Sequence, residues 1–97
     1  MRINFESETP IYMQIAESIE DAVLSGAFPE ETQVPSTTEI SVAYKINPAT
    51  VLKGMALLSE EGILYKKRGV GMFVKQGAAA YVGRKRRRDF YRSYVVA

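Results

Sequence analysis

The chain has 97 residues, enough for one folded domain and a short appendage but not for a second hydrophobic core. It contains no cysteine and no histidine, which excludes disulfides, thiolate metal sites, cysteine nucleophiles and histidine general bases. No apolar run approaches the roughly 18 residues that span a bilayer, and the N-terminus lacks the apolar stretch of a signal peptide. We therefore expect a cytoplasmic protein that is not an enzyme, with no metal, no cofactor and no membrane partner.

The formal net charge of +2 conceals two halves of opposite sign. Residues 1–62 carry three basic and ten acidic side chains, a net charge of −7. Residues 63–97 carry ten basic side chains and one acidic one, a net charge of +9. A segregation of this size indicates a polyanionic partner for the basic half. The acidic half is expected to be scaffold that faces solvent.

The first expected element is an amphipathic helix that ends near Ser25. Thr9 suits its N-cap, Pro10 its first helical position and Gly26 a left-handed C-cap. Apolar residues recur every four positions and predict a core stripe, with alanines on its flanks: Ile11, Ile15, Ile19 and Val23, with Ala16 and Ala22. The polar side should face solvent and consists of Gln14, Glu17, Ser18, Glu20 and Asp21.

A short second helix is expected after a connection that spans residues 27–33. Ser36 followed three residues later by Glu39 is a capping box, which marks the start of a helix. The helix should stop near Lys45, because the residue before a proline avoids helical backbone geometry and an Asn-Pro pair follows. Its apolar face should consist of Ile40, Ala43 and Tyr44.

A third helix follows after a turn of about three residues, which completes a helix-turn-helix. Asn47 is a good N-cap, Pro48 a good first residue, and Gly62 ends the helix after Glu61. The core face should consist of Val51, Met55 and Leu58, with Leu52 and Ala56 beside it. The exposed side should carry Ala49, Thr50 and Lys53.

Two short strands over residues 63–68 and 72–75 are expected to form a β-hairpin. Gly69 and Gly71 supply the positive φ angles that its turn needs. Three cations stand just before the tip: Lys66, Lys67 and Arg68. Cations neutralise phosphates and glycine lets backbone N–H groups come close, so this composition favours a DNA-binding wing over a strand edge protected by charge.

Together these elements predict an α+β, mostly α-helical domain over residues 1–76, a winged helix-turn-helix with three helices and a β-hairpin wing. In this arrangement the third helix enters the major groove and the wing approaches phosphates or the minor groove. Capping alone also explains Ser36 and Asn47, so a DNA contact there is additional. The candidate DNA-binding residues are Ser36, Thr37, Thr38, Asn47, Pro48, Ala49, Thr50, Lys53, Lys66, Lys67, Arg68, Gly69 and Gly71.

Residues 77–97 are expected to form a short basic C-terminal helix. The run from Arg84 to Arg88 fits a solvated helix face, a phosphate contact or the flank of a dimer-forming helix. The chain ends without a helix stop signal, which fits a piece of a longer protein or a tail that lies in an interface. Large apolar side chains on this segment need cover from a partner subunit or from the first helix: Tyr81, Phe90, Tyr91, Tyr94 and Val95.

Over about residues 10–76 the chain resembles the GntR family of bacterial transcription regulators. The resemblance rests on Pro10 to Ala16 with Ser25-Gly26, Val34 to Ile40, Asn47 to Val51, and Arg68 to Val74. The Asn-Pro start of the third helix, the Gly-Met-Phe-Val strand and the short basic tail look most like the YtrA-type subfamily. This resemblance implies a dimer with a short helical C-terminal part in place of a large effector-binding domain. Many such regulators repress operons that encode ATP-binding-cassette transporters.

Two departures from the family pattern limit what the resemblance implies. Thr38 and Pro48 stand where many members have arginine, and neither side chain can make the bidentate contact that arginine makes with guanine. The common Pro-Gly-Asp turn is replaced by Pro29-Glu30-Glu31. We expect a homodimeric repressor of unknown effector that binds pseudo-palindromic, double-stranded operator DNA. The alternative is a winged-helix module that binds protein or RNA, favoured by the single cation of the third helix.

Overall fold

The computed structural model describes the backbone of residues 1–96 and the side chains of residues 1–91. Within that range the elements follow one another as α1 (Ile11–Ser25), α2 (Thr37–Tyr44), α3 (Pro48–Glu60), β1 (Leu64–Lys67), β2 (Gly71–Val74) and α4 (Ala78–Val96). This order confirms the expected winged helix-turn-helix, with three helices, a hairpin wing and a C-terminal helix. No helix in the described part has the length and the apolar composition needed to cross a membrane.

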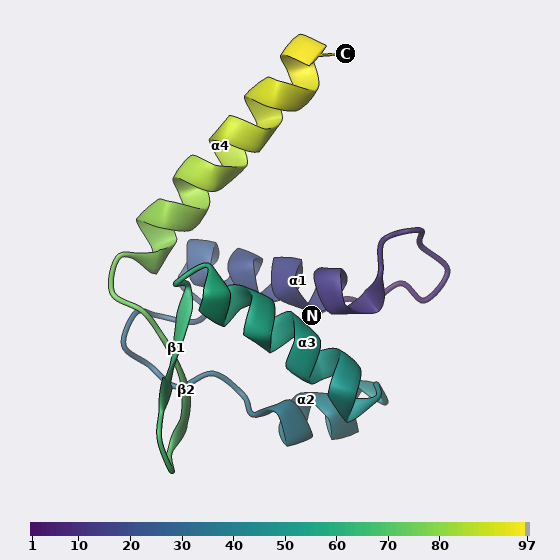
Figure 1. Cartoon of the computed structure of the whole chain (residues 1–97), viewed down its shortest axis with the longest axis vertical. Coiled ribbons are helices and arrows are strands. Elements are labelled where there is room, and N and C mark those ends of the chain that lie inside the picture. The colour runs from purple at the N-terminus through teal and green to yellow at the C-terminus, as the bar shows by residue number, and fades with distance from the viewer. Residues whose placement is uncertain (97) are drawn as a thin grey trace.

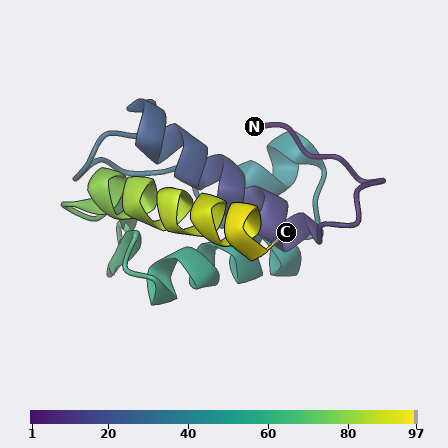
Figure 2. The same ribbon diagram turned by 90° about the horizontal axis from the view of Figure 1, so that it is seen from above.

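The helices form a small body from which α4 and the wing project in opposite directions. α1 packs against α3 and against the beginning of α4, and α2 packs against α3. Figure 1 shows α2 and the wing tip at one end of the long axis and the end of α4 at the other. Seen from above, α4 runs beside α1 (Figure 2). This geometry separates a surface made by α2, α3 and the wing from a surface made by α4.

The core lies between α1, α3 and the hairpin, and the expected stripe of α1 forms one wall of it. Ile15, Ile19 and Val23 are buried, while Ile11 is half-buried at the edge. The expected core face of α3 is likewise buried. Burying an aliphatic side chain of this size contributes about 1.5–3 kcal/mol relative to exposure. The larger members of the core are Ile15, Ile19, Met55, Leu58, Ile63, Leu64, Val51, Val74 and Val82.

The start of α1 differs by one residue from the sequence expectation. Pro10 has an extended ψ of 146° and its carbonyl accepts bonds from the N–H groups of Met13 and Gln14, so Pro10 is the N-cap and Thr9 is not. The Gln14 side chain donates to the carbonyl of Thr9 at 2.8 Å and so ties down the segment before the helix. At the other end, Gly26 has a φ of 86° and is the left-handed C-cap that was expected.

Helix α2 has a narrower buried face than its sequence suggested. Ile40 is its buried residue, whereas Ala43 and Tyr44 are exposed. The helix has eight residues and packs against α3. The expected turn is confirmed, since Lys45 ends the helix in the left-handed region with a φ of 53°.

The hairpin is antiparallel and is shorter than expected, because its turn already begins at Arg68. Gly71 pairs with Lys67 and is therefore the first residue of β2 instead of a turn residue. The connection between α1 and α2 pairs with the outer edge of β2: the N–H of Val34 donates to the carbonyl of Met72 at 2.9 Å. The N–H of Val74 donates in turn to the carbonyl of Thr32 at 3.0 Å. Strand β2 is thus hydrogen-bonded along both edges, to β1 on one side and to the connection between α1 and α2 on the other.

Candidate nucleic-acid interface

The first turn of α2 is held by the expected capping box. The Oγ of Ser36 accepts a bond from the N–H of Glu39 at 3.0 Å, and the carboxylate of Glu39 accepts one from the N–H of Ser36 at 3.1 Å. Capping therefore accounts for Ser36, which is exposed but already bonded. Thr37 is half-buried and Thr38 is exposed, so of these two Thr38 presents more surface to a partner.

The turn between α2 and α3 fixes where α3 begins. Ile46 is buried, and its carbonyl accepts a bond from the hydroxyl of Ser41 at 2.6 Å. The side chain of Asn47 accepts from the N–H of Ala49 at 2.8 Å, which confirms Asn47 as the N-cap and places Pro48 at the first position. The start of α3 is thus bonded to its own turn, and both Pro48 and Ala49 face outward.

The outward face of α3 is more apolar than its sequence suggested. Ala49 and Lys53 are exposed as expected, whereas Thr50 is half-buried. Leu52 and Ala56 do not lie beside the core face, since both are exposed, and this expectation is wrong. The spacing contained the signal: residues 49, 52 and 56 stand three and four positions apart, which puts them on one face of a helix.

Lys53 does not project straight out from α3. Its Nζ lies 4.1 Å from the centroid of the Tyr12 ring, which belongs to α1. A cation over an aromatic face contributes about 0.5–1 kcal/mol at an exposed site. The single cation of α3 is therefore drawn toward α1, at the margin of the outward face.

The wing carries its cations on the exposed arm of β1 and on the turn. Lys66, Lys67 and Arg68 are all exposed, and Lys67 stacks with its Nζ 4.2 Å from the centroid of Phe73. Gly69 and Gly71 have φ angles of 79° and 146°, which confirms the expected positive values. The three cations of the wing are thus exposed on β1 and its turn, with Lys66 and Lys67 on opposite faces of the hairpin because side chains alternate along a strand.

The tip is held from the side by a residue that the sequence reading did not single out. The side-chain amide of Gln33 donates to the carbonyl of Val70 at 2.9 Å, and Gln33 forms a β-bridge with Phe73. Near the base of the wing, the hydroxyl of Tyr65 donates to Glu31 at 2.7 Å, and this bond raises the pKa of Tyr65. Residues 31 and 33 therefore brace the wing at both ends.

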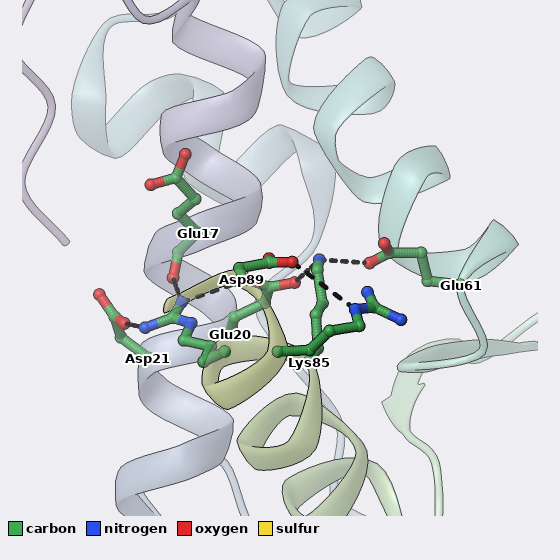
Figure 3. Close-up of polar contacts among 8 residues, drawn as sticks. Glu17, Glu20, Asp21, Glu61, Lys85 and Asp89 are labelled. Carbon is green, nitrogen blue, oxygen red and sulfur yellow. Dashed lines mark hydrogen bonds and ion pairs between the residues drawn. The ribbon is translucent and has the colours of Figure 1, made fainter. Parts of the chain in front are cut away.

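Two cations of the basic run on α4 bind carboxylates of their own chain (Figure 3). The Nζ of Lys85 lies 2.6 Å from Glu20 of α1 and 2.9 Å from Glu61 at the end of α3. Arg86 binds Asp21 and Glu20, and also donates to the carbonyl of Glu17. The expectation that Glu20 faces solvent is wrong: it is 4% exposed, because α4 covers it.

These ion pairs decide part of the ambiguity over the basic run. Burial alone would lower the pKa of Lys85, but its hydrogen bonds to Glu20 and Glu61 outweigh this and raise the pKa. Lys85 and Arg86 thus bind α4 to α1 and to the end of α3. Because both cations are already paired with carboxylates of their own chain, they are not available to bind phosphates. Arg84, Arg87 and Arg88 remain exposed on the same helix.

The first turn of α4 is bound by a further carboxylate, that of Glu30. It accepts a bond from the N–H of Ala79 at 3.1 Å. Backbone bonds from Gly77 and Ala79 lower the pKa of Glu30, against the smaller opposing effect of burial. The connection between α1 and α2 therefore touches both the wing and the start of α4.

The residues expected in a dimer interface are divided by the structure. Tyr81 is half-buried and packs against the core of its own chain. Phe90 and Tyr91 are 66% and 65% exposed, and their rings meet edge to face at 6.1 Å between centroids. The side chains of Tyr94 and Val95 lie outside the described residues. Among the described side chains, those of residues 1–91, no group of three or more acidic residues is arranged to hold a metal ion.

A family model described as "Bacterial regulatory proteins, gntR family" matches residues 11–74, from the first residue of α1 to the last of β2. The chain belongs to the gntR family. The family and the relatives found are DNA-binding transcription regulators, not enzymes. The matched range therefore includes α1 and the whole surface formed by α2, α3 and the wing.

Comparisons with individual proteins agree with this assignment. The HTH-type transcriptional repressor YtrA of Bacillus subtilis is 33% identical over 78 residues, which cover 80% of this chain and 60% of YtrA. A solved structure of YtrA from Sulfolobus acidocaldarius, a GntR-family transcription factor, has a TM-score of 0.75 at 27% identity and covers 99% of this chain and 83% of that one.

The fold is also that of AraR(DBD), solved in complex with operator ORX1, with a TM-score of 0.69 at 24% identity over 76% of this chain and 95% of that one. The chain spans between 30% and 60% of the length of the first curated relatives that it matches.

Proposed function

We propose that this gntR-family protein is a homodimeric transcription repressor that binds a pseudo-palindromic operator in double-stranded DNA. The observation that carries the proposal is the common placement of α2, the start of α3 and the basic wing tip at one end of the molecule (Figure 1). A helix-turn-helix places the start of its second helix against base edges, while a basic wing lies along the backbone. The likeness in fold to AraR(DBD), solved on operator ORX1, supports this placement.

The candidate DNA-binding residues divide into two groups by chemistry. Lys66, Lys67 and Arg68 are exposed cations suited to phosphates, and Gly69 and Gly71 keep the tip slender. The remaining candidates lie at or near the starts of α2 and α3, where backbone N–H groups face phosphates and outward side chains face base edges: Ser36, Thr37, Thr38, Asn47, Pro48, Ala49, Thr50 and Lys53. Affinity then comes mainly from the wing.

We assign residues 1–76 to DNA binding and residues 77–97 to dimer formation. Leu24 at the end of α1 is 45% exposed, and it lines a shallow groove together with Phe90 and Tyr91 of α4. A second copy that covered these side chains would gain about 1.5–3 kcal/mol for each one fully buried. Because α4 projects away from the wing, a two-fold pairing through it leaves both wings open to DNA (Figure 1). Tyr81, held in its own core, contributes less than Phe90 and Tyr91.

The regulated target that fits the YtrA-type resemblance is an operon for an ATP-binding-cassette transporter, and the site of action is the cytoplasm. Similarity to the transcriptional repressor YtrA over 80% of the chain supports repression as the mode of control.

A winged-helix module that binds protein or RNA is the second candidate, favoured by the placement of Lys53 over Tyr12. Binding of a labelled random-sequence duplex, with single-stranded RNA as competitor, separates the two. The repressor hypothesis requires binding to the duplex that the Lys67→Ala/Arg68→Ala double variant weakens. The double variant should also reduce the slope of log K against log salt by about two for each subunit. The charge-matched control Lys75→Ala/Arg84→Ala should bind like the parent. Preference for the RNA, or equal binding by both double variants, would favour the module.

A further inference from the structure

The outward face of α3 is built of hydrocarbon at the end that would enter the groove. Ala49, Leu52 and Ala56 are all exposed, and Leu52 is 59% exposed. Their spacing of three and four residues makes them one stripe along the helix. A single exposed leucine is ordinary on a protein surface, but here it stands at the centre of the stripe that faces a proposed partner.

Polar side chains suited to hydrogen-bonding bases are scarce on this helix. Residues 48–60 contain no arginine, asparagine or glutamine, which are the side chains that pair bidentately with guanine or adenine. The one cation, Lys53, lies over the ring of Tyr12. The side-chain oxygen of Asn47, just before the helix, accepts the bond from Ala49 that caps it.

The major groove offers one apolar group that distinguishes bases, the C5 methyl of thymine. Resting on the proposed function, we propose that Leu52, flanked by Ala49 and Ala56, contacts thymine methyl groups and is the main specificity-determining residue of α3. The operator is then selected through the positions of its thymines, and guanine contributes little.

The test uses a duplex selected from a random-sequence pool by the full chain. Each thymine in the selected site is replaced in turn by deoxyuridine, which removes the methyl and keeps every hydrogen-bonding group. One buried methyl changes affinity about fourfold, so at least one replacement in each half-site should raise Kd about fourfold. In the Leu52→Ala variant the same replacement should leave Kd unchanged, because the contact is already lost. A 5-methylcytosine–guanine pair in place of the same thymine–adenine pair should bind more tightly than an unmethylated cytosine–guanine pair there, which tests the methyl in a second base.

Val42→Ala is the matched control for Leu52→Ala. Val42 is 74% exposed on α2 and lines a groove with Ala22 and Phe28, so its truncation is at least as harmless to the fold. The Val42→Ala variant should keep the full, about fourfold difference in Kd between the thymine duplex and the deoxyuridine duplex. If every deoxyuridine duplex binds the parent like the selected one, or if Leu52→Ala keeps the difference, the methyl contact is overturned while DNA binding stands. If no duplex is retained even at low salt, the proposed function itself has failed, and this inference with it.

Discussion

The side-chain amide of Gln33 occupies the space in which a Cβ at residue 71 would stand, so Gln33 and Gly71 are fitted to one another across the edge of the wing. The same amide donates to the carbonyl of Val70 and holds the tip. A glycine is needed here because of its φ of 146°, and a Cβ would in addition displace the end of the Gln33 side chain from its bond with Val70. At Gly69 the φ of 79° is the sole reason, because nothing lies within 4 Å of a Cβ built there.

Gly71→Ala should therefore destabilise the fold more than Gly69→Ala. We expect about 1 kcal/mol for Gly69→Ala, from the left-handed backbone alone, and about 2 kcal/mol or more for Gly71→Ala. Urea unfolding of both variants measures the difference. In a Gln33→Ala background the excess at residue 71 should become smaller, since the obstructing amide is gone and only the backbone strain at a φ of 146° remains. An equal cost of Gly71→Ala with and without Gln33 would show that the two residues are not coupled.

The cluster around Glu20 should contribute measurably to the attachment of α4. Glu20→Gln keeps the shape of the side chain but leaves Lys85 and Arg86 without their buried carboxylate. Because Lys85 remains 20% exposed and water can reach it, we expect a loss of about 1–3 kcal/mol in the free energy of unfolding. Glu17→Gln is the control, because Arg86 binds the backbone carbonyl of Glu17 and the Glu17 side chain is exposed. If both variants lost the same free energy of unfolding, the ion pairs of Glu20 would not contribute to the attachment of α4.

Glu30 should make the stability of the fold sensitive to acid. Its pKa is lowered from the ordinary 4.5, first by the backbone bond from Gly77 and then by that from Ala79. A carboxyl whose pKa is lower in the folded state stabilises the fold above its unfolded pKa and loses this effect as the pH falls through its folded pKa. Glu30→Gln should therefore reduce the loss of stability between pH 7 and pH 3, measured by urea unfolding at each pH. The exposed Glu8→Gln serves as control, and an unchanged loss in Glu30→Gln would contradict the assignment.

The apolar surface of α4 should control the oligomeric state. Leu24→Ser/Tyr91→Ser removes two exposed apolar side chains that would be buried between two copies. Even half-burial of each in the interface makes the dimer dissociation constant rise tenfold or more. Sedimentation equilibrium measures that constant. The control is Val42→Ser, which removes an exposed apolar side chain of α2, away from α4. The same constant in all three proteins would place the dimer interface elsewhere.

Local signals account for what could be predicted from the sequence. The capping box at Ser36, the Asn47-Pro48 helix start and the glycines of the wing act over a few residues, so pattern alone located them. Glu20 depends on Lys85, 65 residues later, and Gln33 on Val70, 37 residues later. No local pattern contains such pairs. A polar residue on an amphipathic helix is expected to face solvent. Glu20 does not, because α4, which comes much later in the sequence, covers it.

Leu52 illustrates a different kind of failure. Its apolar character suggested a place near the core, but its position on the helix, beside exposed Ala49 and Lys53, decides its exposure. The angular position of Leu52 on the helix predicts the outward placement that its hydrophobicity does not. The exposed candidates of the wing needed no such correction, because charge and exposure agree there.

The central claim is that this gntR-family chain binds duplex DNA through its basic wing and α3, and a salt series tests it most directly. The affinity for a random-sequence duplex is measured by fluorescence anisotropy from low to physiological salt. With about three to five phosphates neutralised per subunit, log K should fall with log salt at about 0.9 per phosphate, a slope of roughly −3 to −4.5 for each subunit that is bound. Absence of binding at the lowest salt, or binding that does not depend on salt, would contradict the claim.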